Sequence, residues 1–199
     1  MAASSHFVRA VDDSGNRSAS TPATTAVATE PADATLIGSG SSWSYFYSAI
    51  DPAPGWQAPD YDASSWQTGL APLGWGQAIL GTTLTAAAPK PLTSYFRRSF
   101  TIADLSEIGA IEVTTRADDG IVLYLNGAEI TRVNMPSGIV TSGTYALSAV
   151  SATNALAHPV VVQIPGSSLL AGTNVMTAEV HSNYRSTPSA SFELSAVVK

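Results

Sequence analysis

From Leu36 onward, the chain is a succession of short apolar runs separated by clusters of Gly, Pro, Asn and Ser. Short runs bounded by such turn residues are typical of β-strands. Eight runs fit this description, at residues 43–48, 93–102, 110–117, 120–126, 128–134, 158–164, 174–182 and 189–198. Helical periodicity is almost absent, apart from one turn at 104–109, and no alternation of strands with helices supports a parallel sheet. The sequence therefore predicts an all-β fold, an antiparallel β-sandwich of the jelly-roll type.

Residues 120–133 carry the strongest hairpin signal in the chain. The run from Ile121 to Leu125 is apolar at successive positions, as expected for a strand that is covered on both faces. Asn126 and Gly127 follow, and this dipeptide supplies the positive φ angles that a two-residue hairpin turn requires. We predict a buried hairpin here, with the acidic pair that precedes it at the rim of the sandwich rather than in its core.

The N-terminal part of the chain has a different composition. Residues 1–18 contain one predicted strand, from His6 to Val11, and a turn, which is too little to bury a face alone. They resemble the last strand of a fibronectin type III module in a set of matching residues: Phe7, Val8, Ala10, Val11, Asp12, Gly15, Asn16 and Ser18. Residues 19–35 are rich in Ser, Thr, Ala and Pro and predict a flexible linker. We expect a module remnant at 1–18, this linker, and a β-sandwich at 36–199, together a piece of a longer multidomain protein.

The composition excludes several classes of function. With 199 residues, 45% of them hydrophobic, the chain can form one full-sized domain with its own core. The net charge of -6 and the nine scattered Lys and Arg residues argue against a nucleic-acid partner, whose phosphates require clustered positive charge. The absence of cysteine excludes disulfides and thiolate nucleophiles. No apolar run approaches the roughly 20 residues of a membrane span, and the first residues lack the apolar core of a signal peptide, so we expect no membrane partner.

Four motifs occur in order along the predicted sandwich: YFRRSFTI, TTRADDGIVLYLNGAEITRVNMPSG, LLAGTNVMTAEVH and SFELSAVV. Together they resemble the galactose-binding-like β-sandwich, a carbohydrate-binding-module type of accessory domain in bacterial secreted hydrolases. The resemblance implies a noncatalytic role in binding glycans or cell-wall material, a secreted or cell-surface location, and a structural calcium ion. It also implies a catalytic domain in the same parent chain. Where such modules commonly carry an aspartate before the last strand, this chain reads PSASF at 188–192.

Asp118 and Asp119 are adjacent carboxylates followed by Gly120 in a predicted loop. Calcium takes about six to eight oxygen ligands from such loops, and a glycine lets backbone oxygens approach closely, so the pair is a candidate metal site. The alternative is an Asx-type turn, in which one carboxylate accepts backbone N–H bonds. Catalysis is disfavoured, because adjacent residues on an extended chain point apart and cannot flank a glycosidic bond.

Glu179 and His181 lie two positions apart on the run at 174–182, so they share one face of a strand. The alternate positions between and before them are apolar and are predicted to face the core: Met176, Ala178 and Val180. A carboxylate beside an imidazole can bind sugar hydroxyls, because the first accepts and the second can donate. The same pair could equally form part of the solvated face of a sheet. Arg185, in the loop that follows, adds a further donor near the same rim.

Aromatic and polar residues elsewhere complete the candidate site. Trp75 lies between two glycines and is the tryptophan most expected to be exposed as a platform for sugar stacking, whereas the other three are expected to pack in the core or to anchor a turn-rich excursion. Arg97 lies on the opposite side of its strand from the apolar residues, and Asn134 ends the hairpin. Each can contact a ligand or satisfy backbone groups. The predicted ligand-binding residues are Trp75, Arg97, Asn134, Glu179, His181 and Arg185.

These features favour a noncatalytic, monomeric binding module that tethers a larger secreted hydrolase to a polysaccharide or cell-surface glycan. A second hypothesis is a structural spacer that packs on a catalytic domain without a small ligand, which an exposed apolar patch would favour. A third is a hydrolase fragment, which would need a pocket with convergent titratable groups. The sequence contains no nucleophile elbow, P-loop or H-E-x-x-H motif to support that third hypothesis.

Overall fold

The computed structural model describes residues 6–8, 11–15, 21–23, 34–85, 88–106 and 108–199. The chain forms two compact units, residues 1–32 and 33–199. In the first unit, β1 (His6–Val8) pairs antiparallel with β2 (Thr21–Ala23). Thus β1 lies within the predicted N-terminal strand, whereas β2 falls in the segment predicted as a linker. Residues 19–20 and 24–33 of that segment lie outside the described residues, and the fibronectin type III resemblance stays a prediction.

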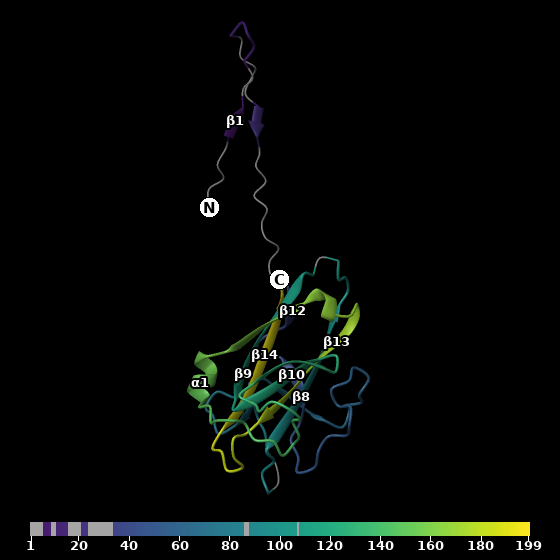
Figure 1. Ribbon diagram of the computed structural model, residues 1–199, viewed down its shortest axis with the longest axis vertical. Coiled ribbons are helices and arrows are strands. Elements are labelled where there is room, and N and C mark those ends of the chain that lie inside the picture. The colour runs from purple at the N-terminus through teal and green to yellow at the C-terminus, as the bar shows by residue number, and fades with distance from the viewer. Residues whose placement is uncertain (1–5, 9–10, 16–20, 24–33, 86–87, 107) are drawn as a thin grey trace. The chain divides into compact units, whose positions relative to one another are not determined.

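The second unit is an all-β sandwich of two sheets (Figure 1). Sheet I has the strand order β11-β10-β13-β8-β4-β5. Its strands, in chain order, are β4 (Ser42–Phe46), β5 (Gln67–Leu70), β8 (Thr93–Ile102), β10 (Gly120–Leu125), β11 (Ala128–Val133) and β13 (Gly172–His181). Sheet II has the order β12-β9-β14-β6-β7, and β3 also pairs with β14. Its strands are β3 (Thr35–Ile37), β6 (Leu73–Trp75), β7 (Thr82–Thr83), β9 (Ala110–Asp118), β12 (Val160–Pro165) and β14 (Ala190–Val198).

The connections between the two sheets give the predicted jelly roll. Four strands of sheet I lie in the order β8-β13-β10-β11, and four of sheet II in the order β3-β14-β9-β12. The chain therefore crosses repeatedly between sheets and pairs early strands with late ones, as in two nested Greek keys. All these pairings are antiparallel, and among the described residues only β6 and β7 pair in parallel.

Strand β14 occupies the centre of sheet II. One of its edges pairs with β9 from Ser191 to Val198. The other edge is shared by two short strands, because β6 pairs with residues 190–192 and β3 with Ala196 and Val197. Both edges of this late strand are therefore occupied by earlier parts of the chain.

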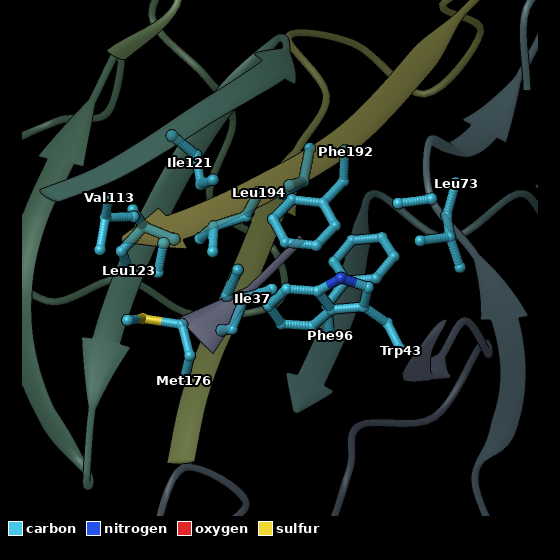
Figure 2. Close-up of a cluster of buried hydrophobic side chains, with 14 of the residues drawn as sticks. Ile37, Trp43, Leu73, Phe96, Val113, Ile121, Leu123, Met176, Phe192 and Leu194 are labelled. Carbon is cyan, nitrogen blue, oxygen red and sulfur yellow. The ribbon is translucent and has the colours of Figure 1, made fainter. Parts of the chain in front are cut away.

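The core lies between the sheets and is built from alternate residues of each strand (Figure 2). Phe192 of β14 is at its centre: its ring stacks on Phe96 of β8, with centroids 4.2 Å apart, and meets the edge of Trp43 at 4.9 Å. Met176 of β13 is fully buried in the same cluster. This close packing of aromatic and aliphatic side chains joins sheet I to sheet II.

The eight predicted strands are all present, with ends that differ from the prediction by at most two residues. The hairpin turn is also confirmed, since Asn126 has φ 52° and Gly127 has φ 88°. Four strands of the sandwich, β3, β5, β6 and β7, are too short to show an alternating pattern and were not predicted. Helix α1 (Ala152–Ala157), which begins where the Ser151 side chain accepts the Asn154 N–H, was also missed. In the described part of the chain, no helix has the length and apolar character needed to cross a membrane.

Candidate functional site

The outward face of sheet I carries polar and aromatic side chains, because successive residues of a strand point to opposite faces. On β13, Met176, Ala178 and Val180 face the core, as predicted. Glu179 therefore points outward, and the strand register places it beside Val122 of β10 and Tyr95 of β8. This row crosses the middle of the sheet and forms the floor of the candidate site.

The 47–66 loop, which joins β4 to β5, covers one part of this face with aromatic rings. The Trp56 ring lies with its centroid 5.0 Å from that of Tyr95 and 5.7 Å from that of Tyr124, in edge-on geometry in both cases. Trp66 packs against Phe46 at 5.5 Å. Two of the four tryptophans therefore anchor this loop, as predicted for the turn-rich excursion.

Arg97 holds the 47–66 loop in place from the sheet below it. Its guanidinium donates to the backbone carbonyls of Trp56, Pro59 and Tyr61, at 3.2, 2.8 and 3.4 Å. The Arg97 side chain is buried by this contact. Since the guanidinium donors are directed at loop carbonyls, the structure gives Arg97 a positioning role instead of the predicted ligand contact.

The 134–151 loop, which joins β11 to α1, covers another part of the face. Met135 and Ala146 of this loop pack on Val122. The loop lies so close to β10 that a Cβ atom at Gly120 would be 2.6 Å from the Met135 sulfur and 2.8 Å from the Ala146 Cβ. The glycine that follows the acidic pair is therefore required for the loop to seat on the sheet.

Two predicted site residues hold the start and end of the 134–151 loop. Asn134, at φ 57°, donates to the carbonyls of Ser148 at 2.8 Å and Asp119 at 3.2 Å, and accepts the Ser148 N–H at 3.2 Å. Asp119 accepts the Val150 N–H at 2.6 Å. The predicted ligand contact at Asn134 is thus corrected to a loop anchor, because its amide groups are used within the protein.

His181 links the same loop to the floor of the site. Its ring is fully buried, and Nδ1 lies 2.8 Å from the Thr144 carbonyl oxygen, so Nδ1 must carry the hydrogen of that bond. The other ring nitrogen, Nε2, lies 3.3 Å from Glu179 Oε2. His181 therefore anchors the 134–151 loop from behind the site, and its complete burial corrects its predicted role as a ligand contact.

A cavity of about 380 Å³ lies between the two loops, above the outward face of sheet I. Its lining combines aromatic rings, carboxylates, hydroxyls and an amide: Asp51, Trp56, Gln57, Tyr95, Tyr124, Thr141, Ser142 and Glu179. A second hollow of about 270 Å³ also includes Asp51, Tyr95 and Ser142 in its lining, and adds Arg185. The two hollows thus adjoin along the sheet, and we call them together the loop-walled groove.

Glu179 is held in a fixed position on the floor of the groove. Its Oε1 accepts a hydrogen bond of 2.5 Å from the Tyr124 hydroxyl, and only 5% of the residue is exposed. Burial, reinforced by the charges of Glu179 and Asp51, raises the pKa of Tyr95 well above its usual range. Burial and the Glu179 hydrogen bond raise the pKa of Tyr124 in the same direction. Both phenols therefore remain protonated at neutral pH and are hydrogen-bond donors.

Trp75 does not form the exposed platform that its flanking glycines suggested. It is 8% exposed and packs in the core, where its ring stacks on Tyr47 at 5.0 Å. The Lys90 ammonium lies 4.5 Å from the ring centroid. The neighbouring glycines instead allow close backbone contact, since a Cβ at Gly74 would lie 1.9 Å from the Ala190 carbonyl oxygen of the adjacent strand.

The acidic pair lies at the rim, where β9 ends and β10 begins, and its two carboxylates serve different segments. Asp118 Oδ2 accepts from Gln77 at 3.1 Å and Ser189 at 2.8 Å. Besides its bond to the 134–151 loop, Asp119 accepts the Asn183 N–H at 2.8 Å. The peptide bond between the two aspartates is cis. Burial, which is complete for Asp118, raises the pKa of its carboxyl to about 7.

The pair anchors segments that are distant in sequence, which differs from the predicted Asx-type turn, and this geometry does not support the calcium interpretation. Three of its four carboxylate oxygens already accept N–H or O–H groups, whose hydrogens occupy the positions that a cation would take. In the described ranges, no three His, Asp or Glu side chains come together in a way that could hold a metal ion. The residues present therefore do not fit a calcium site.

Of the six predicted ligand-binding residues, the structure brings Glu179 and Arg185 to the groove. Sequence reasoning missed Asp51, Trp56 and Tyr124, which line the same groove. A signal for Tyr124 was present, because its position in the predicted strand alternates with core residues and so faces the same side as Glu179. No comparable signal exists for Asp51, whose position depends on how the 47–66 loop folds back over the sheet.

No protein-family model and no curated protein matches the sequence. Solved structures do match the fold. A glycosyl hydrolase family 2 member from Bacteroides cellulosilyticus matches with a TM-score of 0.50 at 14% identity, over 84% of this chain and 20% of that chain. Bacteroides uniformis β-glucuronidase 2 matches with a TM-score of 0.50 at 13% identity, over 83% of this chain and 18% of that chain. A β-glucuronidase from glycoside hydrolase family 2 matches with a TM-score of 0.50 at 11% identity, over 86% of this chain and 18% of that chain. The chain thus spans about a fifth of the length of these enzymes, and the likeness establishes the β-sandwich fold alone.

Proposed function

We propose that this chain is a noncatalytic accessory module that binds a carbohydrate, such as a polysaccharide or cell-surface glycan, in the loop-walled groove. The observation that carries the proposal is the cavity of about 380 Å³ lined by Trp56, Tyr95, Tyr124 and Glu179. Aromatic rings contact the C–H faces of sugars, and fixed carboxylate and hydroxyl groups bind their hydroxyls. The fold likeness to a fifth of several family 2 glycosidases agrees with a domain attached to a carbohydrate-active enzyme.

The module would act by tethering rather than by chemistry. A glycosidase needs two carboxyl groups flanking the scissile bond, with one of raised pKa as the acid. Among the described carboxyl groups, the clearly raised pKa belongs to Asp118, which is fully buried at the rim and cannot reach a substrate. One carboxylate oxygen of Glu179 already accepts a hydrogen bond from the Tyr124 hydroxyl. We therefore propose a monomeric module, acting outside a bacterial cell, that raises the local concentration of substrate for a hydrolase domain of the same parent chain.

A glycan-array screen of the full chain, followed by affinity electrophoresis on the best polysaccharide, tests this function. Ser142 lines both hollows of the groove, so Ser142→Trp should fill it and reduce binding by at least about tenfold, equivalent to about 1.4 kcal/mol. Ser106→Trp, on an exposed turn, is the matched control and should bind as the unsubstituted chain does. Equal binding by the two variants would show that the groove is not the binding site.

A second function, the structural spacer, is supported by a different surface. A hollow of about 290 Å³ lies between residues 76–79 and α1 and is lined in part by Ile79, Ala155 and Leu156. Ile79 is 75% exposed and Leu156 51% exposed. Such an apolar surface is suited to packing against another domain. If no glycan binds, and Ile79→Asp abolishes association with the hydrolase domain of the parent chain, the spacer function replaces the binding function.

A further inference from the structure

In the larger cavity of the loop-walled groove, the charged lining residues are all acidic. Two carboxylates line it, Asp51 from the 47–66 loop and Glu179 from β13, and no Lys or Arg is among its lining residues in the described ranges. The positive charge of the groove, Arg185, lines the adjoining smaller hollow. Both carboxylates also act on Tyr95, because their charges, after burial, raise the pKa of that phenol. The two acidic groups, far apart in sequence, therefore produce one negative field in the same cavity.

The aromatic residues of the cavity reinforce this field. The Trp56 ring stands at 70° to Tyr95 and at 80° to Tyr124, and all three residues line the cavity. The face of an aromatic ring is negative and attracts a cation, most strongly for tryptophan and where water is excluded. Ring walls combined with a buried carboxylate are the arrangement that recognises an ammonium group. A carboxylated sugar, in contrast, would be repelled by Asp51 and Glu179.

We propose that the larger cavity of the loop-walled groove selects a cationic glycan, one whose sugars carry a free, protonated amine, over neutral and uronic-acid glycans. This inference rests on the proposed function and deepens it. The ammonium would lie against Glu179 and the aromatic rings. The ring hydroxyls of the sugar would meet the polar groups at the cavity wall: Gln57, Thr141 and Ser142. These hydroxyl and amide groups favour a sugar over a simple aliphatic amine, because they match several hydroxyls around one charge.

Isothermal titration calorimetry of the full 199-residue chain with three oligosaccharides of equal length tests the inference. The ligands are a glucosamine oligomer, its fully N-acetylated counterpart and a galacturonate oligomer. At pH 6 the glucosamine oligomer should bind about tenfold to hundredfold more tightly than the acetylated one, since acetylation removes the charge. The galacturonate oligomer should not bind. Raising the pH above about 8, where such amines lose their proton, should weaken glucosamine binding alone.

Substitutions that remove charge without changing shape locate the effect. Glu179→Gln and Asp51→Asn should each reduce glucosamine affinity by about tenfold, which corresponds to about 1.4 kcal/mol. Asp51 is exposed and on a loop, so its variant folds even if the buried Glu179 variant does not. Asp104→Asn, an exposed carboxylate on the loop between β8 and β9, makes the same change in net charge and should have no effect.

The possible outcomes separate the inference from the function on which it rests. Equal affinity for the acetylated and free-amine oligomers, or tighter binding of galacturonate, overturns the cationic selectivity and leaves glycan binding standing. Binding of none of the oligosaccharides, and of no other glycan, overturns both. Binding of a polylysine peptide as tightly as the glucosamine oligomer would show recognition of a cationic protein, and also overturns the inference. Selective binding that is lost in Asp51→Asn supports it.

Discussion

The two faces of strand β13 are made of alternating residues of one short sequence, yet they are buried by different interactions. On the inward face, Met176, Ala178 and Val180 pack into a core in which side chains from both sheets interlock. On the outward face, Glu179 and His181 are nearly as buried, but they are covered by loops and held by hydrogen bonds. Burial on one face thus follows from apolar contact, whereas burial on the other follows from polar anchoring of loops.

This difference explains why most of the polar residues that attract attention in the sequence do not line the groove. Arg97 fixes the 47–66 loop, while Asn134, Asp119 and His181 fix the 134–151 loop. Buried polar groups need partners, and loop backbones supply unsatisfied carbonyl and N–H groups that need partners as well. The anchors shape the groove, and other residues on the same face line it.

The inward face should be the more sensitive to truncation. Replacing Phe192 by Ala removes its contacts with Phe96 and Trp43 and leaves a cavity between the sheets, so the free energy of unfolding should fall by about 3–5 kcal/mol. Urea denaturation measures the change. Tyr145→Ala, at a residue that is 46% exposed, is the control and should cost less than about 0.5 kcal/mol. A loss below about 1 kcal/mol for the Phe192 variant would mean that the core does not depend on this stack.

Substitution of an anchoring residue on the outward face should destabilise the loop that it holds rather than the whole sandwich. Arg97→Met removes three hydrogen bonds to loop carbonyls and should lower the free energy of unfolding by about 2 kcal/mol. Amide hydrogen exchange should accelerate in the 47–66 loop while β13 and β8 keep their protection. Arg185→Met, at an exposed arginine, should change neither quantity. Uniform acceleration of exchange across the sandwich would contradict an anchoring role confined to one face.

The buried carboxyl of Asp118, at the rim of the sandwich, should make the stability of the protein depend on pH. The Asp118 carboxyl has its pKa raised to about 7 in the folded protein from 3.8, chiefly by burial, so folding favours its protonated form. Its contribution to stability is complete below pH 3.8 and is lost as the pH rises through 7. Asp118→Asn cannot ionise at this position, so we expect it to remove this pH dependence. The difference in unfolding free energy between the variant and the unsubstituted chain should shift in favour of the variant by about 2 kcal/mol between pH 5 and pH 8.

Thermal unfolding over the same pH range measures this difference. Asp119→Asn provides the contrast, because the Asp119 carboxylate accepts two backbone N–H groups and an amide can accept only through its one oxygen. That variant should be less stable at every pH. A pH profile identical for the Asp118 variant and the unsubstituted chain would show that the buried carboxyl does not titrate in this range.

Calcium should have the smallest effect. Because the acidic pair is occupied by hydrogen-bond donors, the melting temperature in millimolar calcium and in EDTA should agree within about 1 °C. A bound ion at 100 times its dissociation constant would instead add about 2.7 kcal/mol to stability. A clear rise in melting temperature with calcium, lost in Asp118→Asn, would restore the metal interpretation.

The fold was largely predictable because the long strands carry their own pattern. The alternation around Met176 and Glu179 and the dipeptide Asn126-Gly127 depend on neighbours in the sequence, and the structure confirms both. The groove was only partly predictable. Whether a polar residue such as His181 reaches solvent depends on loops that fold over it from elsewhere in the chain. Asp51 and Trp56 become part of the site only through the path of the 47–66 loop, which no local pattern specifies.

The central position of β14 in sheet II has a consequence for synthesis. During translation, β9, β6 and β3 leave the ribosome before the strand that joins them, so the edges that β14 will occupy stay unpaired until residues 190–198 emerge. Exposed strand edges bind other chains and promote aggregation. Premature termination just before β14 should therefore yield an insoluble product, because sheet II closes only when β14 pairs with β9, β6 and β3.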